Sequence, residues 1–297
     1  MSRLVFAGTA PFAVPALRAL TAAGHQVELV VTQPDRPANR LQMTAPAVKL
    51  AAQELGVPVF QPERLRAEEA VSRIAALKPE LLVVAAYGQI VPAPVLSIAS
   101  CCPLNVHASL LPRWRGAAPV AYAIREGDRV TGVSIMVMDE ALDHGPVLSR
   151  EETAIGPRED AVELTSRLAR LGAGLLVETI TRLPEIQPED QDHARATYAG
   201  KLSRTDGELD WSLAAEALDR HVRAYRTWPG VTVPFAGGRV KVLSGRPLSG
   251  GGEPGTVLRA EREGVEVACG EGSYLLEEVQ LPGRKPMPAR LLVAKRA

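Results

Sequence analysis

Residues 3–31, RLVFAGTAPFAVPALRALTAAGHQVELVV, decide the fold of the N-terminal part of this chain. Residues 4–7 form a short apolar run that ends at Gly8. Residues 13–23 then repeat apolar side chains with helical spacing, and residues 27–31 form a second apolar run. A strand, a helix and a second strand in this order predict a βαβ unit.

The same alternation continues along the chain. We predict helices over residues 48–55, 67–77 and 161–183, and strands over residues 57–60, 81–85 and 133–137. Strands that alternate with helices favour a parallel sheet covered on both faces, so the predicted class is α/β and Rossmann-like. Only one glycine of a dinucleotide-binding fingerprint is present, at Gly8, which argues against NAD binding.

The C-terminal third has a different pattern. From Trp228 onward, turn signals separate short β-like runs, at residues 231–233, 239–242, 256–258, 265–267 and 274–276. These runs predict a small β-barrel or a curled sheet. Residues 184–192 contain prolines and acids without an apolar period. We therefore predict one domain over residues 1–189, a linker over residues 190–207 and a β domain over residues 208–297.

Composition limits the possible partners and compartments. The chain has 297 residues, with 34 Lys and Arg against 34 Asp and Glu, so any nucleic-acid contact must come from a local patch. Its three cysteines show no disulfide or metal-ligand spacing, so we expect a reducing compartment and no metal. The N-terminal apolar run is too short for a signal peptide or a membrane span. We expect a cytoplasmic monomer without membrane contact.

A first cluster of polar residues lies within residues 103–116. If residues 104–107 are extended, Asn105 and His107 project from the same face, because side chains alternate along a strand. The pair would lie at the carboxyl end of a strand, which is where open parallel sheets bind ligands. The alternative is a core histidine with satisfied hydrogen bonds beside a turn asparagine.

A second cluster, residues 138–146, follows the apolar run 133–137. Asp139 and Glu140 fit a solvated acidic loop. Asp143 lies close to Gly145, a residue that permits close backbone approach, so Asp143 is the candidate for a buried role.

These two clusters suit the attack of an amine on an acyl carbon. In that reaction the amine loses a proton and the carbonyl oxygen gains negative charge. His107 and Asn105 would stabilise the oxygen by hydrogen bonds. Asp143 would orient the imidazole and help to move protons, directly or through water.

The chain resembles the folate-dependent formyltransferase family over almost its full length. The matching motifs are residues 6–9, 31–37, 86–90, 105–116, 139–145 and 201–211. The resemblance implies that the Asn-x-His pair, Asn105 and His107, and the later Asp143 are catalytic. It also implies a Rossmann-like formyltransferase domain followed by an OB-like β-barrel domain.

The resemblance further implies a donor and an acceptor. The formyl donor would be 10-formyltetrahydrofolate, and no metal is implied. The folate-binding segment of the family corresponds to Ser109, Leu110, Leu111 and Pro112. The turn at Tyr87 and Gly88 would form a wall of the pterin pocket. The acceptor would be the α-amino group of initiator methionyl-tRNA, because residues 201–211 resemble the tRNA-directed members.

Basic residues provide candidate RNA contacts. Residues 279–297 contain no acid but five basic side chains, which fits either an RNA-binding face or a solvated tail. The resemblance favours RNA, and we predict tRNA contacts at Arg36, Arg40, Arg239, Lys241, Arg284 and Lys285. Two alternatives stay open: formylation of a small amine such as a ribonucleotide or amino sugar, and RNA binding without catalysis.

Overall fold

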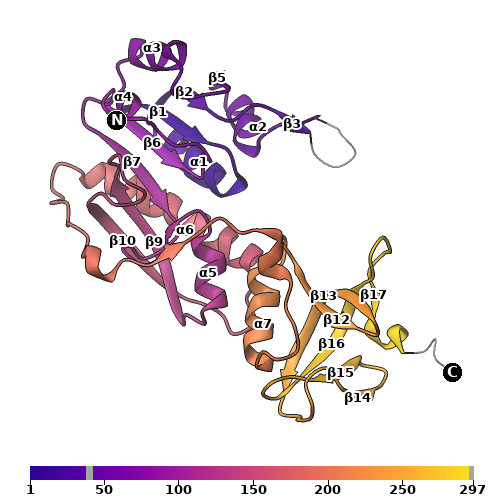
Figure 1. Cartoon of the computed structure of the whole chain (residues 1–297). Coiled ribbons are helices and arrows are strands. Elements are labelled where there is room, and N and C mark those ends of the chain that lie inside the picture. The colour runs from indigo at the N-terminus through magenta and orange to yellow at the C-terminus, as the bar shows by residue number, and fades with distance from the viewer. Residues whose placement is uncertain (38–42, 294–297) are drawn as a thin grey trace. The chain divides into compact units, whose positions relative to one another are not determined.

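The computed structural model describes residues 1–37 and 43–293, which divide into two compact units (Figure 1). The first unit comprises Met1–Pro119, Val130–Ala154 and Thr165–Ala199, and the second comprises Val120–Arg129, Ile155–Leu164 and Gly200–Ala297. The predicted domain boundaries after residues 189 and 207 stay predictions. Within the described residues, no helix is both long and apolar enough to cross a bilayer.

The first unit is built on a seven-stranded sheet of order β10-β9-β7-β6-β1-β2-β5. Its strands are β1 (Arg3–Gly8), β2 (Gln26–Val31), β5 (Val59–Phe60), β6 (Leu81–Ala85), β7 (Cys102–His107), β9 (Val130–Val137) and β10 (Val147–Ala154). Neighbouring strands from β7 to β5 are parallel, as the alternating pattern predicted.

The sheet is mixed, however, because β9 runs antiparallel to β7 and β10 runs antiparallel to β9. The chain leaves β7 at His107, forms a loop at that end of the sheet, and re-enters as β9 from the same end. A parallel pair would instead need a crossover back to the opposite end of the sheet. The sequence pattern predicted the strands but not this change of direction.

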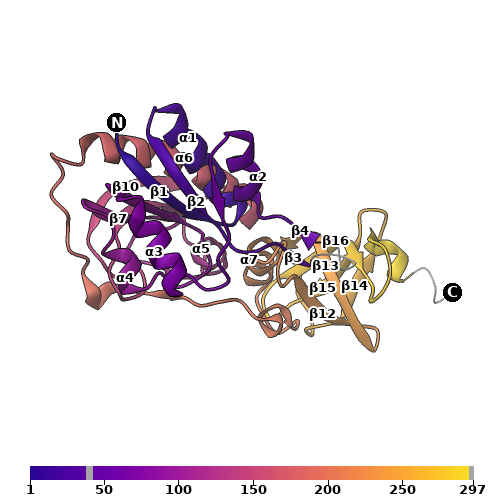
Figure 2. The ribbon, with the colours of Figure 1, turned by 90° about the horizontal axis from the view of Figure 1, so that it is seen from above.

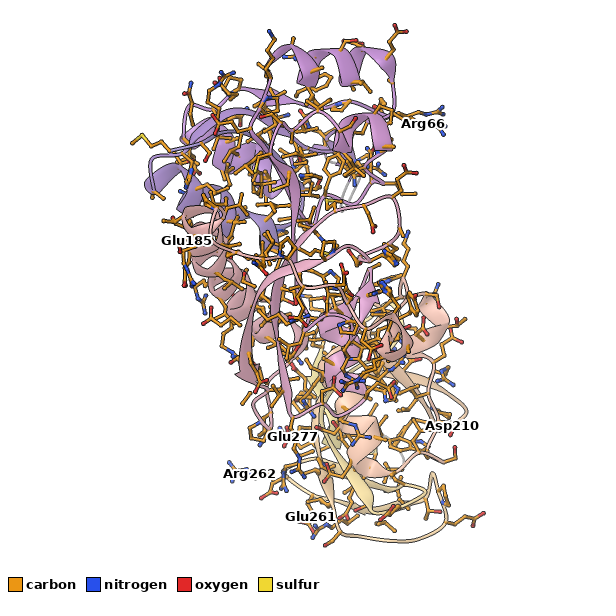
Figure 3. The ribbon with its side chains drawn as sticks, turned by 90° about the vertical axis from the view of Figure 1, so that its left-hand side faces the viewer. Arg66, Glu185, Asp210, Glu261, Arg262 and Glu277 are labelled. Atoms are coloured by element: carbon orange, nitrogen blue, oxygen red, sulfur yellow. The ribbon has the colours of Figure 1, made fainter. Side chains whose placement is uncertain are left out.

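Helices cover both faces of this sheet. Figure 2 shows α1 (Val14–Ala22), α2 (Ala47–Glu54) and α6 (Ala161–Arg182) on one face, and α3 (Glu68–Ala76) and α4 (Ala93–Leu96) on the other. Strand residues such as Val5, Leu82 and Val84 are buried in one apolar cluster. Charged side chains such as Arg66 and Glu185, labelled in Figure 3, are exposed. Burial of the apolar residues is the main stabilising term for such a layered unit.

Short elements complete the first unit. These are the 3-10 helices η1 (Pro11–Ala13) and η3 (His193–Arg195), and the two-residue strands β3 (Arg36–Pro37), β4 (Met43–Thr44), β8 (Arg115–Gly116) and β11 (Tyr198–Ala199). Strand β8 pairs in parallel with β11, which ties the loop after β7 to a segment about 80 residues later. Helix α5 (Pro119–Arg125) follows that loop and belongs to the second unit from Val120 onward.

The second unit is β-rich, as the C-terminal pattern predicted. An antiparallel sheet has the order β12-β13-β16-β15-β14, with β17 paired to β16. Its strands are β12 (Val231–Phe235), β13 (Gly238–Leu248), β14 (Val257–Ala260), β15 (Val265–Ala268), β16 (Ser273–Gln280) and β17 (Met287–Pro288). Register shifts within β13, on either side of Ser244, bend this long strand.

A helix that the sequence analysis did not identify, α7 (Ala215–Ala224), packs against this sheet. Leu218 and Val222, four residues apart, are buried on one face of the helix. On the sheet, Val240 and Leu276 are fully buried. Two 3-10 helices, η4 (Arg204–Gly207) and η5 (Ala289–Leu292), flank the unit.

Candidate active site

Strand β7 carries the two polar residues that the sequence pattern selected. Asn105 and His107 are 9% and 6% exposed, which is rare for such side chains without defined partners. Both lie within a strand that has neighbours on each side, β6 and β9, so their backbone positions are fixed. His107 is the last residue of β7, at the carboxyl end of a parallel strand.

Asp143 lies over this pair. Its Oδ1 accepts a hydrogen bond from Asn105 Nδ2 at 3.3 Å and is 3.6 Å from His107 Nδ1. Its Oδ2 accepts the Gly116 N–H at 2.8 Å. The backbone at Asp143 is left-handed, with φ +47°, which aspartate tolerates better than most residues. The structure therefore brings the amide and the imidazole of β7 together with a carboxylate from the loop between β9 and β10.

The orientation of His107 follows from its second nitrogen. His107 Nε2 is 2.9 Å from the Trp114 carbonyl oxygen. A carbonyl oxygen only accepts, so Nε2–H is the donor and Nδ1 is the nitrogen that faces Asp143. Trp114 is itself left-handed, with φ +60°, which directs the chain back over the end of β7.

Close packing against Ala199 of β11 requires a glycine at position 116. A Cβ at this position would lie 2.5 Å from the Ala199 carbonyl oxygen, and its φ of +115° is strained for other residues. The same carbonyl accepts the Ala117 N–H at 2.8 Å. Glycine therefore lets the chain approach β11 closely while its own N–H holds the Asp143 carboxylate.

The predicted folate-binding segment is fixed beside β9. Ser109 is 1% exposed, and its hydroxyl donates to the Arg113 carbonyl oxygen at 2.6 Å. Ser134 Oγ donates to the Ser109 carbonyl oxygen at 2.7 Å and accepts the Leu111 N–H at 3.1 Å. Leu111 is buried, whereas Leu110 and Pro112 are half-buried. The segment is thus a rigid wall next to His107.

The turn after β6 contributes its backbone rather than its aromatic ring. The Tyr87 side chain is 2% exposed and belongs to the apolar core. The Tyr87 carbonyl oxygen accepts from Thr9 Oγ1 at 2.7 Å and from Gln33 Nε2 at 2.9 Å. Gly88 has φ +82°, and a Cβ there would meet Gln33 Nε2 at 2.5 Å. The sequence predicted the turn but not the inward direction of the ring.

The Tyr87 hydroxyl is buried without a hydrogen-bond partner within residues 1–37 and 43–293. Burial raises the pKa of Tyr87 to about 12, because the ionised phenolate would lose its hydration.

Two buried residues next to the site were not predicted from the sequence. Gln191, assigned to the linker, is 4% exposed and packs within the first unit, and Arg115 is 2% exposed. Gln191 is buried because its amide finds partners at Arg115 and at the main-chain oxygens of Asp143 and Gly145. The motif around residues 105–116 included Arg115, but nothing in the local pattern near Gln191 indicates burial.

The candidate tRNA contacts fall into two groups. Arg36 is exposed and donates to Gln33 Oε1 at 2.9 Å, whereas Arg40 lies outside the described residues. In the second unit, Arg239 is exposed but donates to Thr232 Oγ1 at 3.1 Å and to the Leu209 carbonyl oxygen. Lys241 is half-buried, and Arg284 and Lys285 are exposed.

Known proteins are similar to this chain in sequence. The formyl transferase family model matches residues 2–180, and the model of the formyl transferase C-terminal domain matches residues 201–296. The methionyl-tRNA formyltransferase of Citrifermentans bemidjiense is 46% identical over 97% of this chain and 91% of its own length. That of Pseudomonas paraeruginosa is 48% identical over 96% of this chain and 93% of its own length.

Solved structures share the fold at low identity. HypX from Aquifex aeolicus, in complex with tetrahydrofolic acid, superposes with a TM-score of 0.67 and 18% identity over 98% of this chain and 47% of its own. An N-formyltransferase from Helicobacter canadensis, in complex with folinic acid and dTDP-3-aminofucose, gives a TM-score of 0.68 and 14% identity over 93% and 98% of the two chains. With both family models matched and relatives near half-identical along the whole chain, this protein belongs to the formyl transferase family.

Proposed function

We propose that this chain transfers the formyl group of 10-formyltetrahydrofolate to the α-amino group of initiator methionyl-tRNA. One observation carries the chemistry: Asp143 Oδ1 lies 3.3 Å from Asn105 Nδ2 and 3.6 Å from His107 Nδ1 in a largely buried site. The choice of acceptor is supported by relatives at 46% and 48% identity that bear the name methionyl-tRNA formyltransferase and span nearly the whole chain.

Formyl transfer makes two demands on the protein. The bond between the amine nitrogen and the formyl carbon forms, the bond between that carbon and the donor nitrogen breaks, and one proton moves from the amine to the donor nitrogen. Negative charge develops on the formyl oxygen during this exchange. The donor, when bound, supplies the activated formyl carbon, and the side chains must stabilise the oxygen and move the proton.

The three site residues meet these demands. Asn105 Nδ2 carries two N–H groups, of which one meets Asp143, so the second can donate to the formyl oxygen. His107 turns Nδ1 toward the same place, because Nε2–H is held by the Trp114 carbonyl oxygen. It donates to the formyl oxygen when Nδ1 also carries a proton. Asp143 is the proton acceptor for the attacking amine, directly or through water.

The donor site is proposed beside this centre. Ser109, Leu110, Leu111 and Pro112 form a wall anchored to β9 through Ser134. The turn at Tyr87 and Gly88 would contact the pterin through backbone groups, because the Tyr87 ring is turned into the core. A buried, apolar wall with a few fixed polar groups suits a folate, which combines an aromatic ring with hydrogen-bonding edges.

The tRNA site is proposed to use local basic residues, because the chain has equal numbers of basic and acidic side chains. The proposed contacts are Arg36, Arg40, Arg239, Lys241, Arg284 and Lys285. Affinity for tRNA should fall steeply as salt rises, by roughly tenfold or more between 50 and 200 mM if a few phosphates are neutralised. A filter-binding assay over this range of salt checks the proposal. A tRNA affinity that does not change with salt would contradict a contribution from these basic residues.

The test of the function itself is a formylation assay. The chain is incubated with 10-formyltetrahydrofolate and charged initiator tRNA, and the methionyl nitrogen is examined for formyl. Parallel reactions contain an amino-sugar nucleotide or a ribonucleotide amine. Formylation of these small amines but not of the tRNA would contradict the proposal and support the alternative. We further propose that the protein acts as a cytoplasmic monomer, which light scattering coupled to gel filtration and cell fractionation would check.

A further inference from the structure

One glutamine joins the loop of Asp143 to the segment after β7. Gln191 Nε2 donates to the main-chain oxygens of Asp143, at 3.0 Å, and Gly145, at 2.7 Å. Gln191 Oε1 accepts from Nε and Nη2 of Arg115, at 3.1 and 2.7 Å. An amide side chain has two N–H donors and two acceptor positions, so all of them are used.

Arg115 lies between the two main-chain groups that hold the site. The residue before it, Trp114, accepts the His107 Nε2–H, and the residue after it, Gly116, donates to the Asp143 carboxylate. Gln191 therefore closes a ring of contacts. Asp143 is held through its carboxylate by Gly116 and through its main chain by the Arg115–Gln191 pair.

The partners of Arg115 are unusual for a buried cation. Arg115 is 2% exposed, and besides its bonds to Gln191 its guanidinium donates from Nη2 to His193 Nδ1 at 2.8 Å. A guanidinium cannot accept, so this imidazole nitrogen carries no proton. Both partners are neutral, although a carboxylate would stabilise a buried guanidinium more strongly. This arrangement favours a role in placing the loop of Asp143 over a role in stabilising the fold alone.

We propose that Gln191 and Arg115 are positioning residues for formyl transfer. They hold Asp143 in its left-handed conformation, so that its carboxylate is directed at Asn105 and His107. The inference rests on the proposed function, because it gives this loop the role of presenting the proton acceptor. A displacement of about 1 Å at a reacting group lowers turnover by about a hundredfold, so a remote restraint of this kind affects the rate.

Two substitutions separate the bonds of Gln191. Gln191→Leu removes all four bonds and replaces the amide with an apolar side chain. Gln191→Glu keeps acceptors for Arg115 but replaces the Nε2 donor with an oxygen that repels the Asp143 and Gly145 carbonyls. Both variants should lower kcat by about 10- to 100-fold while KM for donor and tRNA stays within about threefold. The matched control is Gln187→Leu, at an exposed position of the same segment, which should turn over like the parent chain.

Amide exchange gives a readout that needs no formylation. The Gly116 N–H is bonded to Asp143 Oδ2, so it should exchange about tenfold faster in both Gln191 variants than in the parent and in Gln187→Leu. If the parent chain formylates neither the tRNA nor the small amines, the proposed function fails, and the exchange experiment still tests the placement of Asp143.

Three results would overturn the inference. One is turnover within threefold of the parent in both Gln191 variants. Another is unchanged exchange at Gly116. The third is a slow Gln191→Leu beside a normal Gln191→Glu, which would mean that Gln191 serves only to hold Arg115. If Gln191→Leu does not fold, Gln191→Glu alone tests the inference: slow turnover with faster exchange at Gly116 supports it, and turnover within threefold of the parent overturns it.

Discussion

Replacing Asp143 with asparagine tests the centre of the proposed chemistry. The change removes the negative charge and one acceptor oxygen but preserves size. Asparagine also tolerates the left-handed backbone that Asp143 adopts, with φ +47°, so the loop itself should be little strained. The effect on turnover then reflects the carboxylate rather than a collapsed loop.

The magnitude follows from the contacts of the two oxygens. The amide oxygen can still accept the Gly116 N–H, which lies 2.8 Å from Oδ2 in the parent. The amide nitrogen then faces Asn105 Nδ2, at 3.3 Å from Oδ1, and donor meets donor. One charge-assisted hydrogen bond is lost and the other is weakened, so the free energy of unfolding should fall by about 1 to 2 kcal/mol. Loss of the proton acceptor should lower kcat by about 100- to 10,000-fold.

Single-turnover formylation and urea unfolding measure the two effects separately. Glu140→Gln is the matched control, because it neutralises an exposed carboxylate in the same loop and should change neither quantity appreciably. Turnover of Asp143→Asn within threefold of the parent would refute the role of the carboxylate. An equal loss in Glu140→Gln would show that the charge of the loop matters instead of the contact with His107.

Three further changes probe the surroundings of the site. His107→Gln should lower kcat by about 100-fold or more at a nearly constant urea midpoint, since a glutamine amide can still donate to the Trp114 carbonyl oxygen; a large loss of stability would contradict this. Gly116→Ala should cost about 2 kcal/mol or more and slow turnover, because its Cβ would lie 2.5 Å from the Ala199 carbonyl oxygen; parent-like unfolding would disprove the close packing. Burial raises the pKa of Tyr87 to about 12, so ionisation of its hydroxyl lowers the free energy of unfolding only as pH rises above 10, by roughly 3 kcal/mol in total once pH exceeds 12. Tyr87→Phe should stabilise the chain at neutral pH, because it removes a buried hydroxyl with no partner in the described residues, and its stability advantage over the parent should grow above pH 10. Curves of stability against pH that run parallel for the two chains would contradict the burial of this hydroxyl.

Much of the fold was predictable because the local spacing of apolar residues indicates its strands and helices. The apolar run at residues 4–7 and the helical spacing at residues 13–23 each reflect burial within a few residues of chain, and the structure has β1 and α1 there. The same rule placed Asn105 and His107 on one side of a strand. Helix α7 was not predicted, although Leu218 and Val222 have helical spacing, because its ten residues stand just before a region of strand-like runs that indicates a β domain.

The direction of β9 and the inward turn of the Tyr87 ring were not predictable in this way. Antiparallel pairing of β9 with β7 depends on the end of the sheet at which the intervening segment finishes. The local sequence pattern does not indicate that end. The Tyr87 ring could face a ligand or the core equally well as judged from sequence. Only the packing of the surrounding apolar cluster decides between them.

The sequence by itself determined the strands and helices of the first unit, the β-rich character of the second, and the residue types needed for acyl transfer. The tertiary structure decided how these residues meet: Asp143 reaches Asn105 across 38 residues, and Gln191 reaches Arg115 across 76. Periodicity is a property of neighbouring residues, whereas such contacts arise when the chain closes on itself and buried polar groups must find partners.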